Sequence, residues 1–211
     1  MTTSHYFDPN PTAASRTRRV RLPLEGIDLE LETDRAVFSR LSVDRGTQLL
    51  LETAPRPPAE GEVLDLGCGY GPIALALAAR APGARIWAVD VNLRALDLVR
   101  RNAAAARLPN VVAAHPDDVP EATRFAAIYS NPPVRIGKAA LHQLLLRWLD
   151  RLEPQGRAYL VVQRYLGSDS LARWLGEQGC LVRRLRSRTG YRVLEAEPRV
   201  RAAPSTKARE S

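Results

Sequence analysis

The sequence has few of the residues that build metal centres or disulfide scaffolds. Its 211 residues include two cysteines, Cys68 and Cys180, and three histidines, and no two of the histidines have the spacing of metal ligands. It also lacks a run of about 18 apolar residues, and its N-terminus lacks the apolar stretch of a signal peptide. We therefore expect no metal site, no membrane partner and a cytoplasmic location.

Lysine is almost absent as well. Only Lys138 and Lys207 are lysines among the 31 basic residues, and the net charge of +8 favours an acidic partner such as nucleic acid. Arginines gather near both ends of the chain: Arg16, Arg18, Arg19 and Arg21, then Arg183, Arg184, Arg186, Arg188 and Arg192. Such clusters bind phosphates regardless of base sequence, although solvated strand faces produce the same pattern.

The hydrophobic pattern changes at Gly61. Before it, residues 1–19 predict a loosely ordered arm, residues 20–34 a β-hairpin turning at Glu25-Gly26, and residues 46–52 a short helix. After it, apolar strands (62–69, 85–92, 111–115, 125–130 and 156–163) alternate with helices (72–81, 93–108, 138–152 and 170–179). Residues 181–197 predict a closing antiparallel hairpin that turns near Thr189-Gly190.

This alternation indicates an α/β fold with a mostly parallel, doubly wound sheet and an antiparallel edge. We divide the chain into an N-terminal extension (1–60), a core domain (61–197) and a tail without predicted structure (198–211). With 45% hydrophobic residues, the chain can bury a sizeable core.

A glycine loop follows the first strand of the core domain. The stretch DLGCGYG (65–71) places Gly67, Gly69 and Gly71 between a strand and a helix. A dinucleotide-binding loop needs a further glycine at position 72, where this chain has Pro72, and a pyrophosphate would lie close to the charge of Asp65. S-adenosylmethionine (SAM) carries an ammonium and a sulfonium group, which favour a nearby carboxylate. The loop therefore predicts SAM as cofactor and disfavours NAD.

Further carboxylates follow the next two strands. Asp90 ends the second core strand, where a carboxylate can accept hydrogen bonds from both ribose hydroxyls. Asp117 or Asp118 follows the third strand and can receive the amino group of adenine; the spacing does not distinguish between them. The alternative is that these are ordinary turn residues and that the glycines serve tight packing.

The stretch SNPPVRIGK (130–138) ends the fourth core strand with a stiff corner, because neither proline can donate a hydrogen bond. In a doubly wound sheet this corner lies beside the glycine loop. The side chain of Asn131 and the carbonyl of Pro132 can accept both hydrogens of an exocyclic amine, and Pro133 fixes the backbone. Asn131, Pro132 and Pro133 are thus the predicted catalytic corner; the alternative is a purely structural turn.

These segments together resemble the small-domain class I methyltransferases of the ribosomal RNA small-subunit methyltransferase C type. The resemblance rests on HYF (5–7), VFS (37–39), GTQLLLE (46–52), VLDLGCGYGPIALALA (63–78), VDVNLRALDLVRRNA (89–103) and SNPPVRIGK (130–138). It implies a seven-stranded Rossmann-like sheet and methylation of a guanine N2 in rRNA of the small ribosomal subunit. It also implies that Thr47 helps to hold the methionine end of SAM.

Two features depart from the family pattern. Val134 stands where related enzymes often carry an aromatic residue, so a flipped base needs another platform, such as Phe38 or Tyr6. The best-known members also carry an extra N-terminal domain, in place of which this chain has the hairpin extension. Arg135 and Lys138 flank the corner and are predicted to meet RNA phosphates.

Other acceptors and another class of function stay open at this point. A glutamine side chain of a protein and an adenine N6 present the same planar amine to the corner. A SAM-binding RNA-binding or assembly factor without catalysis would also carry the glycine loop and the arginines. The sequence does not decide the oligomeric state.

Overall fold

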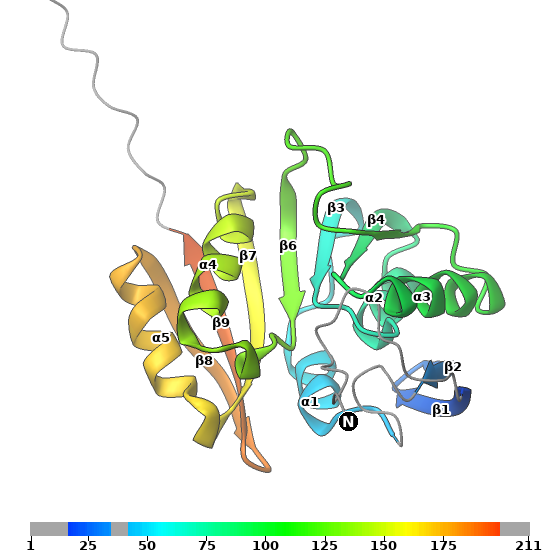
Figure 1. Cartoon of the computed structure of the whole chain (residues 1–211), viewed down its shortest axis with the longest axis horizontal. Coiled ribbons are helices and arrows are strands. Elements are labelled where there is room, and N and C mark those ends of the chain that lie inside the picture. The colour runs from blue at the N-terminus through cyan, green and yellow to red at the C-terminus, as the bar shows by residue number, and fades with distance from the viewer. Residues whose placement is uncertain (1–16, 35–41, 199–211) are drawn as a thin grey trace, which may run out of the picture.

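A computed structural model describes residues 17–34 and 42–198 of the chain, which form a two-stranded sheet and a seven-stranded sheet surrounded by helices (Figure 1). The small sheet pairs β1 (Thr17–Leu24) with β2 (Ile27–Asp34). The large sheet contains β3 (Glu60–Leu66), β4 (Gly83–Val89), β5 (Val111–Ala114), β6 (Phe125–Ser130), β7 (Leu152–Gln163), β8 (Cys180–Arg188) and β9 (Tyr191–Pro198). The helices are α1 (Arg45–Thr53), α2 (Pro72–Arg80), α3 (Leu93–Ala105), α4 (Lys138–Leu149) and α5 (Ser168–Glu177), with 3-10 turns η1 (Val134–Ile136) and η2 (Arg164–Leu166).

The strand order of the large sheet is β5-β4-β3-β6-β7-β9-β8, with the first five strands parallel and the last two antiparallel to their neighbours. This confirms the predicted fold class. From β3 the chain leads outward to β4 and β5, and from β6 it leads outward in the other direction. β3 and β6 are therefore neighbours at the switch point, where doubly wound sheets bind ligands at the carboxyl ends of their strands.

Two hydrophobic clusters cover the two faces of this sheet. Helices α1, α2 and α3 and the β1–β2 hairpin contribute to one cluster, and α4 and α5 contribute to the other (Figure 1). Along β3, Val63 belongs to the first cluster and Leu64 to the second, because successive side chains of a strand point to opposite faces. Both faces of the central strands are thus buried, as in other parallel sheets.

Asn102 fastens the N-terminal hairpin to the core, beside the ion pairs of Arg94 with Asp34 and of Arg101 with Glu32. Asn102 in α3 accepts a hydrogen bond from the backbone N–H of Glu32 (2.7 Å) and donates to the carbonyls of Glu32 and Tyr70 (2.9 Å each). The third bond connects α3 to the glycine loop. The hairpin begins at Thr17, so the predicted arm (1–19) was too long. Its last three residues belong to β1 and pair with β2.

The closing hairpin turns at Thr189-Gly190, as the sequence predicted. Both residues have positive φ angles (49° and 83°), which a two-residue hairpin loop of type I′ requires. The predicted strand 62–69 was too long, because β3 ends at Leu66 and the glycines that follow leave the sheet to form the loop. Residues 1–16, 35–41 and 199–211 lie outside the described part of the chain.

Candidate active site

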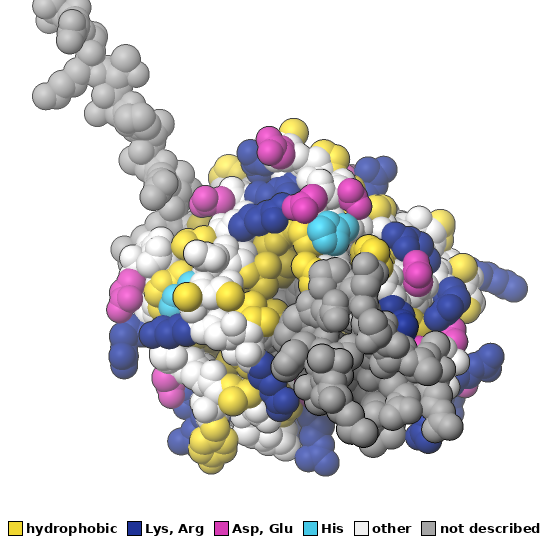
Figure 2. Space-filling view, in the orientation of Figure 1, with side chains coloured by type: hydrophobic (Ala, Val, Ile, Leu, Met, Phe, Trp, Pro, Cys, Tyr) yellow, Lys and Arg dark blue, Asp and Glu magenta, His cyan; other side chains and the backbone are white. Residues whose placement is uncertain are grey.

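A cavity of about 500 Å³ opens at the carboxyl ends of the parallel strands. It is lined by the glycine loop, by Asp90 after β4, by the Asn131–Pro133 corner after β6, and by residues of α1, α4, β7 and β9. Figure 2 shows a hollow on this face with hydrophobic side chains inside it and Lys and Arg side chains around it. Its size and mixed lining suit a small organic ligand with a few polar groups.

The glycine loop depends on its glycines. The N–H groups of Gly67 and Cys68 both donate to the carbonyl of Val89 (2.8 and 3.1 Å), which ties the loop to β4. Gly67, Gly69 and Gly71 have φ angles of 74°, 55° and 92°, in the left-handed region that favours glycine. A Cβ at Gly71 would lie 2.5 Å from Cδ1 of Leu75, so no larger residue fits there. Gly67 and Gly69 line the cavity, whereas Gly71 shapes the turn behind it.

Asp90 supports the loop from the neighbouring strand. One carboxylate oxygen accepts from the N–H of Gly69 and the other from the N–H of Asn92, both at 2.9 Å. Burial raises the pKa of Asp90, and these hydrogen bonds oppose the rise. Asp90 also lines the cavity, so its carboxylate combines contact with the loop and access to a ligand.

Asp65 is fully buried behind the loop. Its Oδ2 accepts from the N–H of Ala74 in the first turn of α2 (2.9 Å), and its Oδ1 has no hydrogen-bond partner in the described part of the chain. Burial raises the pKa of Asp65 to about 8. An orphaned buried acid of this kind fits a site whose ligand brings positive charge, because such a charge would favour the carboxylate form.

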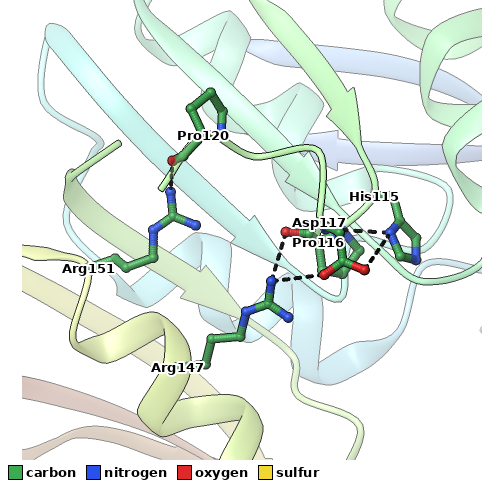
Figure 3. Close-up of polar contacts among 6 residues, drawn as sticks. All are labelled: His115, Pro116, Asp117, Pro120, Arg147 and Arg151. Atoms are coloured by element: carbon green, nitrogen blue, oxygen red, sulfur yellow. Dashed lines mark hydrogen bonds and ion pairs between the residues drawn. The ribbon is translucent and has the colours of Figure 1, made fainter. Parts of the chain in front are cut away.

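The structure places Asp117 and Asp118 outside the cavity lining, where Pro116 lies instead. Figure 3 shows Asp117 between two side chains: its carboxylate pairs with Arg147 (3.0 Å) and lies 3.6 Å from Nδ1 of His115. Arg147 also donates to the carbonyl of Pro116 (3.1 Å) and thereby attaches α4 to this loop. Asp117 is therefore paired with Arg147 at the protein surface and lies outside the cavity lining.

The Asn-Pro-Pro corner lies against the glycine loop, since a Cβ on Gly67 would be 3.8 Å from Cδ of Pro133. Pro133 has φ −74° and ψ 68°, an inverse γ-turn in which the N–H of Val134 donates to the carbonyl of Pro132 (2.8 Å). One lone pair of that carbonyl is therefore used within the turn, and the second stays available. All three corner residues line the cavity.

The side chain of Asn131 is held by two groups of α1 and its cap. Its Nδ2 donates to Oδ2 of Asp44 (2.9 Å) and to Oγ1 of Thr47 (3.2 Å). Asp44 and Thr47 line the cavity as well. Thr47 is thus brought beside the corner, although its predicted partner was the methionine end of SAM.

Sequence reasoning missed Asp44 and Tyr191. Asp44 caps α1 by accepting from the N–H groups of Gly46 and Thr47 (2.8 and 3.1 Å), and its Oδ1 accepts from the hydroxyl of Tyr191 (3.2 Å). Burial and the nearby Asp44 raise the pKa of Tyr191. The stretch Asp-Arg-Gly-Thr before an apolar helix is a capping signal that could have identified Asp44. No local pattern indicates Tyr191, which lies 147 residues away.

The residues predicted to bind RNA do not all lie at the cavity. Arg135 lines the cavity, whereas Lys138 begins α4 outside the lining, and Phe38 and Tyr6 lie outside the described residues. Among the arginines of the closing hairpin, Arg192 is 8% exposed and bonds Ser168 and Asp169 at the start of α5. Its prediction as a phosphate-binding group was wrong, because β9 turns it toward α5.

Within residues 17–34 and 42–198, no cluster of three or more His, Cys, Asp or Glu side chains could hold a metal ion. In the same residues, no helix is long and apolar enough to cross a bilayer.

Comparison with known proteins identifies related chains. The family profile described as "Methyltransferase small domain" matches residues 28–195. YbxB of Bacillus subtilis, an uncharacterized protein, is 34% identical and the match covers 92% of this chain and 98% of YbxB. The ribosomal RNA small subunit methyltransferase C of Shewanella amazonensis is also 34% identical, over 79% of this chain and 50% of its own.

A similar solved structure is the Thermus thermophilus 16S rRNA N2 G1207 methyltransferase (RsmC), in complex with AdoMet and guanosine. It shares 29% identity and a TM-score of 0.74, and the match covers 90% of this chain and 52% of the Thermus chain. The chain therefore spans about half the length of these named rRNA methyltransferases.

Proposed function

The chain belongs to the methyltransferase small domain family and its cofactor is S-adenosylmethionine; from this premise, we propose that it methylates guanine N2 in small-subunit rRNA. The observation that carries the proposal is the position of Asn131 beside the glycine loop, with its amide N–H₂ bonded to Asp44 and Thr47. Its carbonyl oxygen is thereby left as an acceptor for an incoming amine. The Thermus relative, crystallised with AdoMet and guanosine, supports a guanine acceptor.

The residues of the glycine loop and its neighbours would hold the cofactor. Gly67 and Gly69 offer close approach to bare backbone, Gly71 shapes the turn, and Asp90 offers a carboxylate to the ribose hydroxyls. Asp65 would favour the positive charges of the methionine end. Asp117 or Asp118 would have to turn into the cavity to receive adenine. Once bound, SAM supplies an electrophilic methyl group on its sulfonium.

The corner would orient the attacking nitrogen. Asn131 Oδ1 and the free lone pair of the Pro132 carbonyl accept the two N–H groups of the exocyclic amine, and Pro133 keeps both acceptors in place. The nitrogen lone pair forms the new bond to the methyl carbon as the bond to sulfur breaks, with that electron pair going to sulfur. The acceptors stabilise the positive charge that develops on nitrogen, and one proton then leaves to solvent.

The rim of the cavity offers contacts for RNA. Arg135 lines the cavity and Lys138 follows it at the start of α4. Tyr165 in η2 is 86% exposed, and the next residue, Leu166, lines the cavity. The guanidinium of Arg164 lies 5.9 Å from the Tyr165 ring centroid. An exposed aromatic beside arginine and next to the cavity is suited to stack on a base of single-stranded RNA, a role that Val134 cannot perform.

Glutamine and adenine N6 are the competing acceptors, and an RNA-binding factor without turnover is the competing class. We would incubate the protein with methyl-labelled SAM and each of four acceptors: small ribosomal subunits from cells lacking it, naked rRNA, a glutamine-bearing release factor, and DNA. We expect label in the rRNA, either naked or in subunits, which would also fit a cytoplasmic location. Label only in the release factor or DNA, or SAM binding with no transfer to any acceptor, would contradict the proposal.

A further inference from the structure

We propose that Asp44 is a positioning residue that fixes the orientation of the Asn131 amide, and that it thereby restricts the methyl acceptor to hydrogen-bond donors. The inference deepens the proposed function and rests on it. Asp44 and Asn131 are 87 residues apart in sequence, and their side chains meet at the cavity wall.

The chemistry of the contact decides which way the amide faces. An ionised carboxylate has only acceptors, so it binds the N–H₂ end of an amide and repels the carbonyl end. Asp44 Oδ2 lies 2.9 Å from Nδ2 of Asn131, and Oγ1 of Thr47 lies 3.2 Å from the same nitrogen. A flipped amide would bring its oxygen against the carboxylate. Asn131 Oδ1 is therefore directed away from Asp44 and toward the acceptor.

Asp44 is itself fixed from two elements. The N–H groups of Gly46 and Thr47 bond its Oδ2, and the Tyr191 hydroxyl bonds its Oδ1. Gly46 permits this approach, because a Cβ there would lie 2.7 Å from the Tyr191 ring. The carboxylate thus has three donors besides Asn131 and needs no rearrangement when an acceptor binds, which is the condition for a preorganised site.

Two consequences for specificity follow. With Oδ1 facing outward, the corner presents acceptors only, so it binds an amine and not a carbonyl or phosphate oxygen. The negative charge of Asp44, one side chain behind the acceptor oxygen, also favours the positive charge that develops on the attacking nitrogen. We assign Asp44 an action through Asn131, whose amide it holds at the cavity wall.

A double-mutant cycle tests this coupling. Asp44→Ser keeps a hydroxyl that can cap α1 but removes the carboxylate behind Asn131. In the wild-type background we expect the single-turnover rate to fall about 10- to 100-fold, the range for losing a charged hydrogen bond. In the Asn131→Ala background the same change should cost less than about twofold, since the group it positions is gone. The SAM dissociation constant should stay within about threefold in all variants.

The matched control is Asp97→Ser, the same substitution at a residue 66% exposed on α3, where we expect an unchanged rate. An equal loss from Asp44→Ser in both backgrounds would mean that Asp44 only caps the helix, and the proposal would be overturned. The cycle uses whichever acceptor the wild type methylates. A failure of the rRNA assignment is thereby distinguished from a failure of the Asp44 assignment.

A second readout does not depend on turnover. The side-chain N–H₂ resonances of Asn131 can be identified by NMR through their loss in Asn131→Ala. In the wild type we expect their chemical shifts to lie downfield of those of a free amide and their hydrogens to exchange slowly with solvent. Both properties should move to the values of a free amide in Asp44→Ser but not in Asp97→Ser. Resonances that are the same in wild type and Asp44→Ser would contradict the proposal, even if no acceptor were methylated.

Discussion

The two sides of the cavity are built in different ways. The proposed cofactor side, which we define as Gly67–Gly71 with Asp90, is held mainly through its backbone N–H groups: those of Gly67 and Cys68 donate to the carbonyl of Val89, and that of Gly69 donates to the carboxylate of Asp90. The acceptor side, defined as Asn131–Pro133 with Asp44 and Tyr191, is joined by side chains up to 147 residues apart.

This difference separates two tasks. A loop made of glycine and held mainly by main-chain hydrogen bonds keeps a shape that depends little on side-chain conformation. A corner made of side chains from the N-cap of α1, the residue after β6 and the start of β9 can be tuned to one acceptor. We therefore expect substitutions on one side to leave the task of the other side largely intact.

The largest expected effect belongs to Asn131→Ala on the acceptor side. Removing the oxygen that receives the amine should lower the single-turnover rate about 10²- to 10³-fold, comparable to losing one group of a preorganised electrostatic site. The SAM dissociation constant, measured by calorimetry, should change less than about threefold. A SAM affinity that falls as far as the rate would break the separation between the two sides.

On the cofactor side, Asp90→Ala should weaken SAM binding about 10- to 100-fold, because the carboxylate holds Gly69 and is proposed to accept charged hydrogen bonds from the ribose. At saturating SAM the rate should approach that of the wild type. Asp117→Ala and Asp118→Ala, which lie outside the cavity lining, should change the affinity less than about threefold. If either weakens binding as much as Asp90→Ala, that aspartate reaches the adenine after all.

SAM binding should depend on pH through Asp65. Burial raises the pKa of this acid to about 8, and a positive charge bound nearby would lower it. Binding then releases a proton, so affinity should rise with pH by up to about tenfold per unit as the pH approaches about 8 from below, and level off above. Calorimetry on Asp65→Asn should give a flatter profile. An equal slope in both proteins would assign the proton to another group.

Gly71 on the cofactor side should tolerate an added methyl group less well than a glycine outside the loop. Gly71 and Gly167 share the left-handed helical backbone (φ 92°, ψ 21° and φ 102°, ψ 27°), but a Cβ on Gly71 meets the buried Leu75 at 2.5 Å, whereas one on Gly167 lies 3.0 Å from the hydroxyl oxygen of the exposed Ser170. Both alanine variants should lose about 1–2 kcal/mol of unfolding free energy from the backbone. Gly71→Ala should lose about 1–3 kcal/mol more. Denaturant unfolding of the pair measures the difference; equal losses would mean that Leu75 moves aside freely.

The smallest expected effect concerns the rim. Tyr165→Ala should weaken the affinity for the RNA that the protein methylates about fivefold, with the SAM affinity unchanged. This is near the lower end of the effect expected for the loss of one stacked base. Tyr165→Phe keeps the ring and should behave as the wild type. If Tyr165→Phe weakens binding as much as Tyr165→Ala does, the hydroxyl matters and not the stacking.

The sequence predicted the fold and the glycine loop between β3 and α2 because both depend on local patterns. The glycines, Pro72 and Asp90 belong to one strand-loop-helix-strand segment, and the hydrophobic periods locate the elements around it. Even the turn at Thr189-Gly190 could be predicted, since few dipeptides accept two positive φ angles.

The acceptor side could be predicted only in part. Asn131 follows directly from the Asn-Pro-Pro sequence, but its partners do not, because pairing Asp44 with Asn131 and Tyr191 requires the packing of α1 against β7 and β9. The loop after β5 shows the same limit. A carboxylate after that strand was predicted to face the cofactor, but α4 supplies Arg147, and Asp117 pairs with it (Figure 3). Buried Arg192 is a third example, since strand alternation alone does not reveal which helix covers a residue.

The most direct test of the account is the identity of the methylated nucleoside. Small ribosomal subunits from cells lacking the protein would be methylated in vitro by wild type and by Asn131→Ala, and their rRNA digested to nucleosides and analysed by mass spectrometry. The account predicts N2-methylguanosine with the wild type and its near absence with the variant. A product methylated on another atom, or an equal yield of N2-methylguanosine from Asn131→Ala, would contradict it.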